Sequence, residues 1–421
     1  MGKRIPFSIF LFLSFVLVQL QAVDIAVVTM TIGESYQNLV SAATENKQLY
    51  CERHGYDFIN LTENLDTSRP TAWNKILIMQ EVLKNKNYKW VFWIDGDAIF
   101  MNFGITLEEL IDENYNFIVG SDLAGCNTGN FFLKNNEWSE NFLSLLYSHT
   151  EFTHHRYWEQ AAVMRELQHN PDVQKNTKIL APRVINSYLC SLHGEKEVYK
   201  RGDFILHFAT ISGERLCDLL NRYTHLTVYD PSLFNLDNFL DMHGIGLNPQ
   251  NHSSVNEGLI RESQKQQFVE NLNANNTRFK DIAVIGFHAG HSTQIFFETC
   301  MGIQIDACDQ NLNSFTSIGV DFMKRKYRSH FNFFEGDATA LESKYDLIFI
   351  NGDKSFANRF KDIIECQVLA KERAVLWINN CTRNVEKAVN RAVEEGVICI
   401  DQYLKTQDAF GEVKWIIAHY I

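Results

Sequence analysis

Two acidic residues, Asp95 and Asp97, stand at the end of an apolar stretch and could bind a metal ion together. The stretch Trp90–Ile94 reads WVFWI, and its aromatic and β-branched residues predict a buried strand. In open α/β sheets, ligands bind outside the carboxyl ends of the strands. Two carboxylates separated by one small residue offer oxygen ligands to a hard cation, which could hold a diphosphate. A simple turn, for which Asp-Gly is a common signal, is the alternative.

Three further segments carry residues that could belong to a chemical site. Asn127–Gly129 is predicted to be a turn before an apolar strand, and a plain loop is the alternative. The sequence WEQAAV predicts a helix with Glu159 and Gln160 in its first turn, where an acid also suits the helix dipole. His207 lies in the apolar run GDFILHFAT, which predicts a strand. On such a strand a histidine is either a ligand or a core residue.

Alternating strands and helices must position these residues. Hydrophobic periodicity predicts strands at Asp24–Thr31 and Tyr56–Leu61, and helices at Ser35–His54 and Trp73–Lys84. Together with the strand before Asp95 this gives a β-α-β-α-β order, which predicts a parallel sheet with right-handed connections. The first domain is expected to span residues 23–235.

The composition excludes several classes of protein. With 421 residues the chain is long enough for two or three domains, and its 45% hydrophobic content supports packed cores. A net charge of −12 argues against a surface for nucleic acid or for anionic membranes. The nine cysteines show no zinc-ligand spacing, and their pairing cannot be deduced from sequence.

The first 22 residues resemble a targeting segment. Lys3 and Arg4 precede an apolar run, Ile5–Val18, which is shorter than the roughly 20 residues that a spanning helix needs. We expect a cleaved signal peptide, with an uncleaved type II anchor or a buried helix as alternatives. Either of the first two places the body in the secretory pathway, in the Golgi or ER lumen, with membrane contact only through this segment. Four N-glycosylation sequons agree with this: Asn60, Asn251, Asn275 and Asn380.

A second α/β domain is expected at residues 259–421. Periodicity fades over residues 236–258, which predicts a linker. The sequence IAVIGFHAGH then predicts a strand that runs into a glycine-rich turn, and YDLIFING predicts a buried strand further on.

The first domain resembles a family of glycosyltransferases that includes fungal α-galactosyl and α-mannosyl transferases and plant xyloglucan xylosyltransferases. Six segments carry the resemblance in order: NKQLYCERHGYDF, TAWNKILIMQEVL, WVFWIDGDAIFMN, CNTGNFFLKNNEWS, WEQAAV and GDFILHF. The resemblance covers about residues 24–215. It implies a GT-A fold, a nucleotide-sugar donor, a divalent cation that is usually manganese, a glycan or glycoprotein acceptor, and retention of anomeric configuration.

The same resemblance implies roles for individual residues. It implies three metal ligands: Asp95, Asp97 and His207. It places an acid and an amide near the anomeric centre: Glu159 and Gln160. It implies contacts to the nucleotide sugar from five residues: Thr29, Lys75, Asp95, Asn127 and Gly129. In one place the chain departs from the family, because ATISGER follows His207-Phe208 where a Gly-Cys-Lys run is usual. The basic diphosphate contact is therefore either Arg215 or lost.

The second domain resembles the class I S-adenosylmethionine-dependent methyltransferases, which implies a Rossmann-like fold over about residues 260–421. The resemblance implies cofactor contacts from four residues: Gly286, Gly290, Asp309 and Asp337. Several acids of the family pattern are replaced, by Val284, Asn351, Asn379 and Asn380. Active methyl transfer, cofactor binding without catalysis, and a structural or acceptor-positioning role all remain open for this domain.

The sequence thus predicts a metal-dependent, retaining glycosyltransferase that uses a UDP- or GDP-sugar and carries a methyltransferase-like domain. A bifunctional glycosyltransferase and sugar methyltransferase is one alternative. A non-catalytic glycan-binding or scaffold protein is the other, although such a protein need not keep Asp95, Asp97, His207 and the Glu159-Gln160 pair together.

Overall fold

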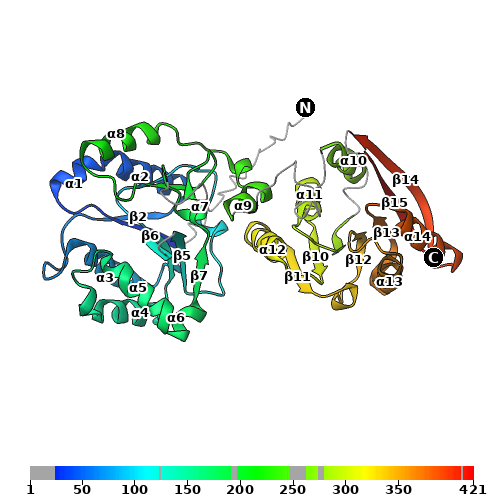
Figure 1. Ribbon diagram of the computed structural model, residues 1–421, viewed down its shortest axis with the longest axis horizontal. Helices are drawn as coiled ribbons and strands as arrows, with labels where there is room; N and C mark the ends of the chain where they lie inside the picture. Colours follow the sequence, from blue (N-terminus) through cyan, green and yellow to red (C-terminus); the bar gives the residue numbers. More distant parts are fainter. Residues whose placement is uncertain are drawn as a thin grey trace, which may run out of the picture.

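The computed structural model describes residues 24–122, 125–190, 197–243, 245, 262–273, 279–408 and 411–421, and these form two α/β units side by side (Figure 1). The expected targeting segment, residues 1–22, lies outside the described residues, as do most of the expected linker and the sequons Asn251 and Asn275. Within the described part of the chain, no helix is long and apolar enough to cross a membrane.

The N-terminal unit is built on a six-stranded sheet with the order β2-β1-β3-β6-β5-β7. Its strands are β1 (Ile25–Met30), β2 (Asp57–Leu61), β3 (Trp90–Ile94), β5 (Phe117–Asp122), β6 (Gly125–Lys134) and β7 (Thr177–Leu180). The first three are parallel, as their β-α-β-α-β order predicted, whereas β6, which follows that order in the chain, is antiparallel to both neighbours. A second small sheet pairs β4 (Ala98–Phe100) with β8 (Ile205–His207).

Helices cover both sides of this sheet, and Figure 1 shows α3, α4 and α5 on one side with α1, α2 and α8 on the other. The helices are α1 (Glu34–Leu39), α2 (Ser41–His54), α3 (Asn74–Leu83), α4 (Glu137–Ser148), α5 (Trp158–His169), α6 (Pro171–Asn176), α7 (Pro182–Ile185), α8 (Gly213–Thr224) and α9 (Leu236–Met242). The single helix expected over Ser35–His54 is interrupted at Val40, which caps α1.

The central strand β3 is buried on both faces. Trp90, Phe92 and Ile94 enter one apolar cluster, while Val91 and Trp93 enter the cluster on the opposite face. Because successive strand residues point to opposite faces, this burial explains why the run is apolar throughout. It also fixes the carboxyl end of β3, where the acids follow.

The C-terminal unit has a seven-stranded sheet with the order β11-β10-β9-β12-β13-β15-β14, in which β15 alone is antiparallel to its neighbours. Counted from its own first strand the order is 3-2-1-4-5-7-6, and the mainly parallel sheet agrees with the expected Rossmann-like fold. Its strands are β9 (Asp281–Ile285), β10 (Gln304–Asp309), β11 (Phe331–Glu335), β12 (Tyr345–Ile350), β13 (Ala370–Ile378), β14 (Ile398–Asp408) and β15 (Gly411–Tyr420). Its helices are α10 (Glu262–Asn273), α11 (His291–Thr299), α12 (Ser314–Tyr327), α13 (Phe356–Cys366) and α14 (Arg383–Glu394).

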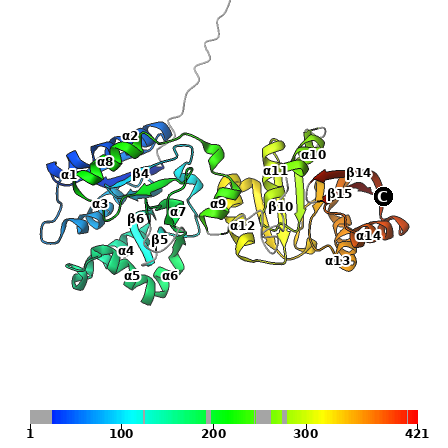
Figure 2. The ribbon, with the colours of Figure 1, turned by 45° about the horizontal axis from the view of Figure 1, so that its top comes forward.

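The helix α9 joins the two units, although it lies in the segment expected to be linker. It packs against α12 of the C-terminal unit (Figure 2). The rings of Phe239 and Phe322 lie 5.5 Å apart, and Asp237 pairs with His291 at 2.8 Å. One continuous apolar cluster contains residues of both units. The units are therefore docked through a shared core.

Candidate functional site

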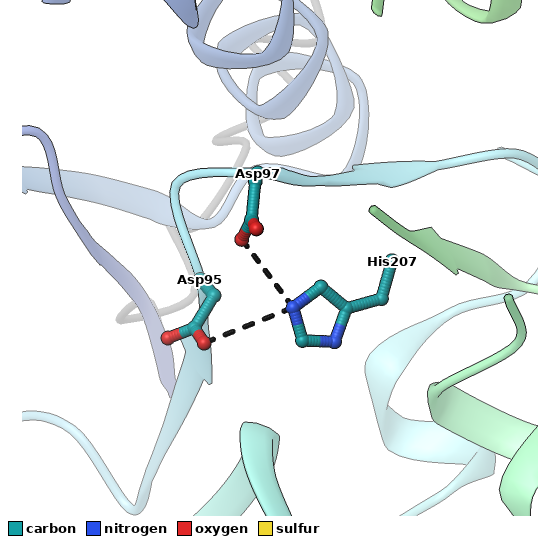
Figure 3. Close-up of side chains that lie close together, drawn as sticks. All are labelled: Asp95, Asp97 and His207. Carbon is teal, nitrogen blue, oxygen red and sulfur yellow. Dashed lines mark ion pairs between the residues drawn. The ribbon is translucent and has the colours of Figure 1, made fainter. Parts of the chain in front are cut away.

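The structure brings Asp95, Asp97 and His207 together (Figure 3). Nε2 of His207 lies 3.3 Å from Asp97 Oδ1 and 3.8 Å from Asp95 Oδ2. One potential ligand atom from each of the three residues lies within 4.8 Å of the others. Two carboxylates and one imidazole are a donor set that suits manganese and similar divalent ions.

Pairing of β4 with β8 creates this cluster. The chain turns after β3 through Asp95 and Asp97, and β4 then runs antiparallel to β8 with Ala98 opposite His207. The backbone N–H of Phe208 donates to the carbonyl of Asp97 at 3.0 Å, which extends the pairing by one residue. The distant histidine is therefore placed beside the acids by the backbone itself.

A buried amide orients the imidazole of His207. Nδ1 of His207 lies 2.8 Å from Oδ1 of Asn186, which also accepts from Asn130 Nδ2 at 3.0 Å. Nδ2 of Asn186 donates to the hydroxyl of Tyr188 at 2.7 Å, so the amide oxygen faces the histidine. Nδ1 must then carry a proton, which leaves Nε2 directed at the acids, as a metal-ligating histidine requires.

The acids and the histidine shift each other's pKa. Burial lowers the pKa of His207, but attraction from Asp97 and Asp95 outweighs it and the net pKa is raised. Burial raises the pKa of Asp97, but His207 outweighs it and the net pKa is lowered. Without a cation, the favoured state is therefore an imidazolium beside carboxylates, and His207 must lose its Nε2 proton before it can act as a ligand.

Two glycines make room for this arrangement. A Cβ on Gly129 would lie 2.3 Å from Cε1 of His207, which means that any side chain there would displace the imidazole. A Cβ on Gly96 would lie 2.8 Å from the hydroxyl of Tyr36 and 3.0 Å from the carbonyl of Met30. Close packing accounts for both glycines. Gly129 and Asn127 lie inside strand β6, so the turn expected at Asn127–Gly129 is wrong.

Lys75 links the metal-ligand cluster to Glu159. Its Nζ lies 3.1 Å from Asp95 Oδ1 and 2.8 Å from Glu159 Oε1, and it donates to the carbonyl of Thr128 at 3.0 Å. Burial lowers the pKa of Lys75, but Asp95 and Glu159 outweigh it and the net pKa is raised. Lys75 therefore stays protonated beside Asp95. A contact with the negatively charged donor, which was expected for Lys75, needs such a positive charge.

The remaining expected residues lie around Thr128. Oε1 of Gln160 accepts from the Thr128 backbone N–H at 3.1 Å, and Oε1 of Glu159 lies 3.3 Å from the Thr128 hydroxyl. Asn127 accepts from the N–H of Gly129 at 2.8 Å. In this conformation, Glu159 and Gln160 hold the strand and Lys75 in place.

Thr29 lies at the carboxyl end of β1, the strand that pairs with β3. Its hydroxyl is buried and has no hydrogen-bond partner among the described residues. A buried polar group without a partner is unusual in a native structure. Thr29 thus has hydrogen-bonding capacity left at the strand edge where a ligand is expected.

Sequence reasoning missed residues that support the site. Lys47 of α2 is fully buried and donates to the carbonyl of Gly96, between the two acids, at 3.0 Å. Its neighbour Asn46 donates to the carbonyl of Phe100 at 3.0 Å and accepts from its N–H at 2.8 Å. Both lie in the NKQLYCERHGYDF segment, so the motif offered a signal. No motif marked Asn186.

In the C-terminal unit, the two glycines expected to approach a cofactor are explained by packing within the chain. A Cβ on Gly286 would lie 2.5 Å from the backbone of Gly352, and a Cβ on Gly290 would lie 2.6 Å from the ring of Phe287. Both have a positive φ, 86° and 96°, which favours glycine in any case. Neither glycine therefore indicates a bound cofactor.

The two acids of the second domain are also engaged. Asp309 accepts from the backbone N–H of His288 at 2.8 Å and of Asn311 at 2.9 Å. Asp337 caps a short turn through the N–H of Thr339 at 3.1 Å and pairs with Lys361 at 2.7 Å. Both carboxylates therefore have partners within the chain.

Neutral residues stand where the resembling methyltransferases have acids. Asn379 donates to Oδ1 of Asn351 at 2.7 Å and accepts from the indole N–H of Trp415. His288 Nε2 lies 2.9 Å from the carbonyl of Asn351, and so links the ends of β9 and β12 where doubly wound sheets bind ligands. The contacts of these residues lie within the chain, and we derive no step through S-adenosylmethionine.

Comparison with known proteins gave a family match in the N-terminal unit. Residues 20–114 and 111–218 match the galactosyl transferase GMA12/MNN10 family. An uncharacterized alpha-1,2-galactosyltransferase of Schizosaccharomyces pombe is 25% identical over 236 residues, which are 45% of this chain and 68% of that protein. The probable alpha-1,6-mannosyltransferase MNN10 of Saccharomyces cerevisiae is 26% identical over 220 residues, 41% of this chain and 56% of that protein.

Two solved structures were also found to be similar. A glycosyltransferase involved in the glycosylation of the major capsid of PBCV-1 has a TM-score of 0.40 and 16% identity, and the match covers 47% of this chain and 98% of that one. An O-methyltransferase from Bacillus cereus in complex with SAH has a TM-score of 0.34 and 16% identity, and the match covers 44% and 90%.

The fold and the family match define the N-terminal unit as a glycosyltransferase domain. Within this domain, residues 20–218, slightly less than half of the chain, match the galactosyl transferase GMA12/MNN10 family. The matches span between 54% and 68% of the length of the first four curated relatives.

Proposed function

We propose that the chain is a metal-dependent glycosyltransferase that moves a hexose or pentose from a UDP- or GDP-sugar to a glycan acceptor with retention. The observation that carries this proposal is the Asp95–Asp97–His207 cluster at the carboxyl end of β3. The family match supports the reaction class. The names of the relatives support galactose or mannose as the first sugars to test.

Asp95, Asp97 and His207 would hold the cation, which we propose to be manganese. When bound, the cation supplies Lewis-acid stabilisation of the diphosphate leaving group. Asn186 keeps Nδ1 of His207 protonated, so that Nε2 remains the ligand atom. Lys75 adds a fixed positive charge beside Asp95, where negative charge develops as the sugar departs.

We propose that Glu159 and Gln160 act near the anomeric centre. Lys75 contacts both Asp95 and Glu159, and Glu159 and Gln160 both contact Thr128. Oε1 of Glu159 contacts Lys75 and Thr128, whereas its buried Oε2 has no hydrogen-bond partner among the described residues. A shift of this carboxylate on donor binding would let it stabilise an oxocarbenium-like sugar.

The donor diphosphate also needs a basic contact that the family usually places after His-Phe. Here Thr210 stands in that segment with a φ of 69°, an unusual conformation for a β-branched residue. Arg215 follows on α8 and is exposed. We propose Arg215 as the replacement contact, reached when the donor is bound.

We further propose that the protein acts in the lumen of the secretory pathway, where nucleotide sugars and glycan acceptors meet. The support is the expected targeting segment at residues 1–22. For the C-terminal unit we propose a structural or acceptor-positioning role. Asn351 and Asn379 stand where the resembling family has acids, and they bond to each other, while His288 bonds to the carbonyl of Asn351.

A donor screen tests the proposed function. Purified protein is incubated with UDP-galactose, GDP-mannose and other nucleotide sugars, with and without manganese, and the released nucleotide is measured. We expect hydrolysis of at least one donor that depends on manganese. Asp95→Asn and Asp97→Asn should each lower it by more than about 100-fold, because losing a ligand exceeds the roughly 10- to 100-fold effect of losing an outer-shell partner. No hydrolysis and no binding of any nucleotide sugar would refute the proposal.

A further inference from the structure

Trp158, the first residue of α5, is the exposed member of the seven tryptophans. Its side chain is 42% exposed, whereas Trp73, Trp90 and Trp93 are at most 2% exposed. No ring or cation partner of Trp158 is found in the described part of the chain. Its neighbour Tyr157 differs, because Arg156 lies 4.3 Å above the Tyr157 ring. The indole of Trp158 therefore offers an uncovered aromatic face.

The backbone of Trp158 is strained. Its φ is 41°, a region that bulky residues rarely adopt and that glycine adopts without strain. Strained residues persist where the surrounding structure holds them, and they concentrate at binding and catalytic sites. Helix α5 would begin at lower conformational cost with a smaller residue at this position. A benefit other than folding is therefore needed to account for tryptophan.

The segment before Trp158 is firmly held. The N–H of Trp158 donates to the carbonyl of His155 at 3.0 Å, and the N–H of Tyr157 donates to His155 Nδ1 at 3.2 Å. The indole N–H of Trp73 donates to the carbonyl of Thr153 at 3.2 Å, which ties the segment to the start of α3. A platform held in this way loses little conformational entropy on binding a ligand.

Trp158 is also next to the proposed reaction centre. The following residue, Glu159, lies 2.8 Å from Lys75, and Lys75 lies 3.1 Å from Asp95. The donor diphosphate must lie at the acids, so its sugar extends toward Glu159. Trp158 is exposed and directly precedes the buried Glu159, so we expect a group that reaches this sugar from solvent to approach the start of α5. Helix α5 contacts the short helical turn Thr71–Trp73, which directly precedes α3, the helix that carries Lys75.

We propose that Trp158 is a binding platform for a pyranose ring of the acceptor glycan. A pyranose presents a face of C–H groups with hydroxyls at its rim, and the negative face of an indole attracts such weakly positive hydrogens. The exposed imidazoles of His154 and His155 lie beside it in sequence and can bond the hydroxyls. This proposal rests on the proposed glycosyl transfer, and it assigns the acceptor side of the site.

The test separates acceptor binding from donor chemistry. Full-length protein with manganese and its donor is assayed with methyl glycosides of mannose, galactose, glucose and xylose, and with the corresponding disaccharides. We expect Trp158→Ala to raise the KM for the acceptor about tenfold and Trp158→Phe to recover part of the loss. Hydrolysis of the donor without acceptor should stay within about twofold of wild type, because Trp158 touches none of the metal ligands.

Two further variants keep the result interpretable. Tyr403→Ala removes an aromatic ring that is 57% exposed on β14 and should change neither quantity. Trp158→Gly relieves the strained φ, so its melting temperature should not fall although its acceptor KM rises. An acceptor KM equal to that of wild type in Trp158→Ala would overturn the proposal, and so would a parallel loss of donor hydrolysis.

Saturation-transfer NMR with the same methyl glycosides tests the platform independently of turnover. If wild-type protein hydrolyses no donor, the proposed function fails while this measurement still decides the role of Trp158. Transfer from the protein to the glycoside that is lost in Trp158→Ala supports the platform. Equal transfer in both proteins overturns it.

Discussion

At the scale of single residues, the site depends on His207 presenting Nε2 to Asp95 and Asp97. The histidine pKa is raised, because the two acids outweigh the effect of burial. A cation must compete with the Nε2 proton, so we expect manganese affinity to rise as the pH increases above about 6.5, the ordinary histidine pKa, and to level off only above the raised pKa of His207. His207→Asn should bind manganese more weakly and without this pH dependence. Calorimetric titrations at several pH values measure both effects.

The same ionisation makes a prediction for the metal-free protein. The folded-state pKa of His207 lies above its ordinary value, so the imidazolium stabilises the fold at pH below the unfolded value of about 6.5. That contribution is lost as the pH rises through the folded-state pKa. Unfolding in urea at pH 6 and pH 8.5 should therefore show a larger loss of stability for wild type than for His207→Asn. An equal loss in both proteins would contradict the assignment.

Gly129 shows how tightly the imidazole is enclosed. Gly129→Ala places a Cβ 2.3 Å from Cε1 of His207, so the ring must move. We expect manganese affinity to fall about 10- to 100-fold, as it does when a ligand loses its orientation, with a stability cost of about 1–3 kcal/mol. Gly396→Ala is a suitable control, since Gly396 has a positive φ of 68° but no atom within 4 Å of the added Cβ. It should cost stability without changing manganese binding.

At the scale of elements, α2 holds the turn that carries the acids. Burial lowers the pKa of Lys47 to about 7, although Asp97 and Asp95 act in the opposite direction. At pH 8 its amine is mostly neutral, and Lys47→Met mainly removes the hydrogen bond to Gly96. We therefore expect manganese affinity to fall about tenfold at that pH. Lys361→Met, on the exposed side of α13, is the control. An unchanged manganese affinity in Lys47→Met would show that the turn keeps its conformation without the hydrogen bond from Lys47.

The elements also show where sequence reasoning was sufficient. Periodicity located β1, α3 and β3 because each follows a simple pattern of burial. Periodicity does not give the direction of β6, because its antiparallel pairing with β3 is set by tertiary contacts that the residues of β6 do not encode locally. It also read Asn127-Thr128-Gly129 as a turn, although Gly129 is glycine because His207 lies against it.

The candidate site was predicted in part for the same reason. The acids and His207 belong to motifs in the resembling family, so they could be named together. Asn186, which follows α7, reaches His207 by a hydrogen bond that no motif of a single sequence reveals, and the motif around Lys47 did not show that its side chain bonds to Gly96. Roles of Glu159, Gln160, Thr29 and Asn127 at the donor remain predictions.

At the scale of the whole molecule, charged residues that are partly or fully buried join the two units. Lys178 of β7 lies 2.8 Å from Asp112 and 2.7 Å from Asp321 of α12. The guanidinium of Arg325 lies 3.0 Å from Asp321 and also donates to the carbonyl of Leu110. The Lys178–Asp321 pair and the Arg325–Leu110 hydrogen bond cross the interface that the apolar cluster also spans. The C-terminal unit is therefore expected to unfold together with the glycosyltransferase domain.

Charge reversal at the interface tests this coupling. We expect one calorimetric transition for wild type. Arg325→Glu places a third acid beside Asp321 and Asp112, and should cost about 3–5 kcal/mol, as breaking a buried pair does. It should separate the melting into two transitions. Lys324→Glu alters an exposed residue of the same helix and should keep one transition; two transitions already in wild type would contradict the coupling.

The central claim, a catalytic cation held by Asp95, Asp97 and His207, is tested most directly by counting bound manganese by electron paramagnetic resonance. Wild-type protein with UDP or GDP is predicted to bind one manganese ion per chain, with nitrogen coupling from an imidazole. The Asp95→Asn/Asp97→Asn double variant, shown to be folded by its melting curve, should bind none at the same concentrations. Equal manganese binding in both proteins would contradict the account.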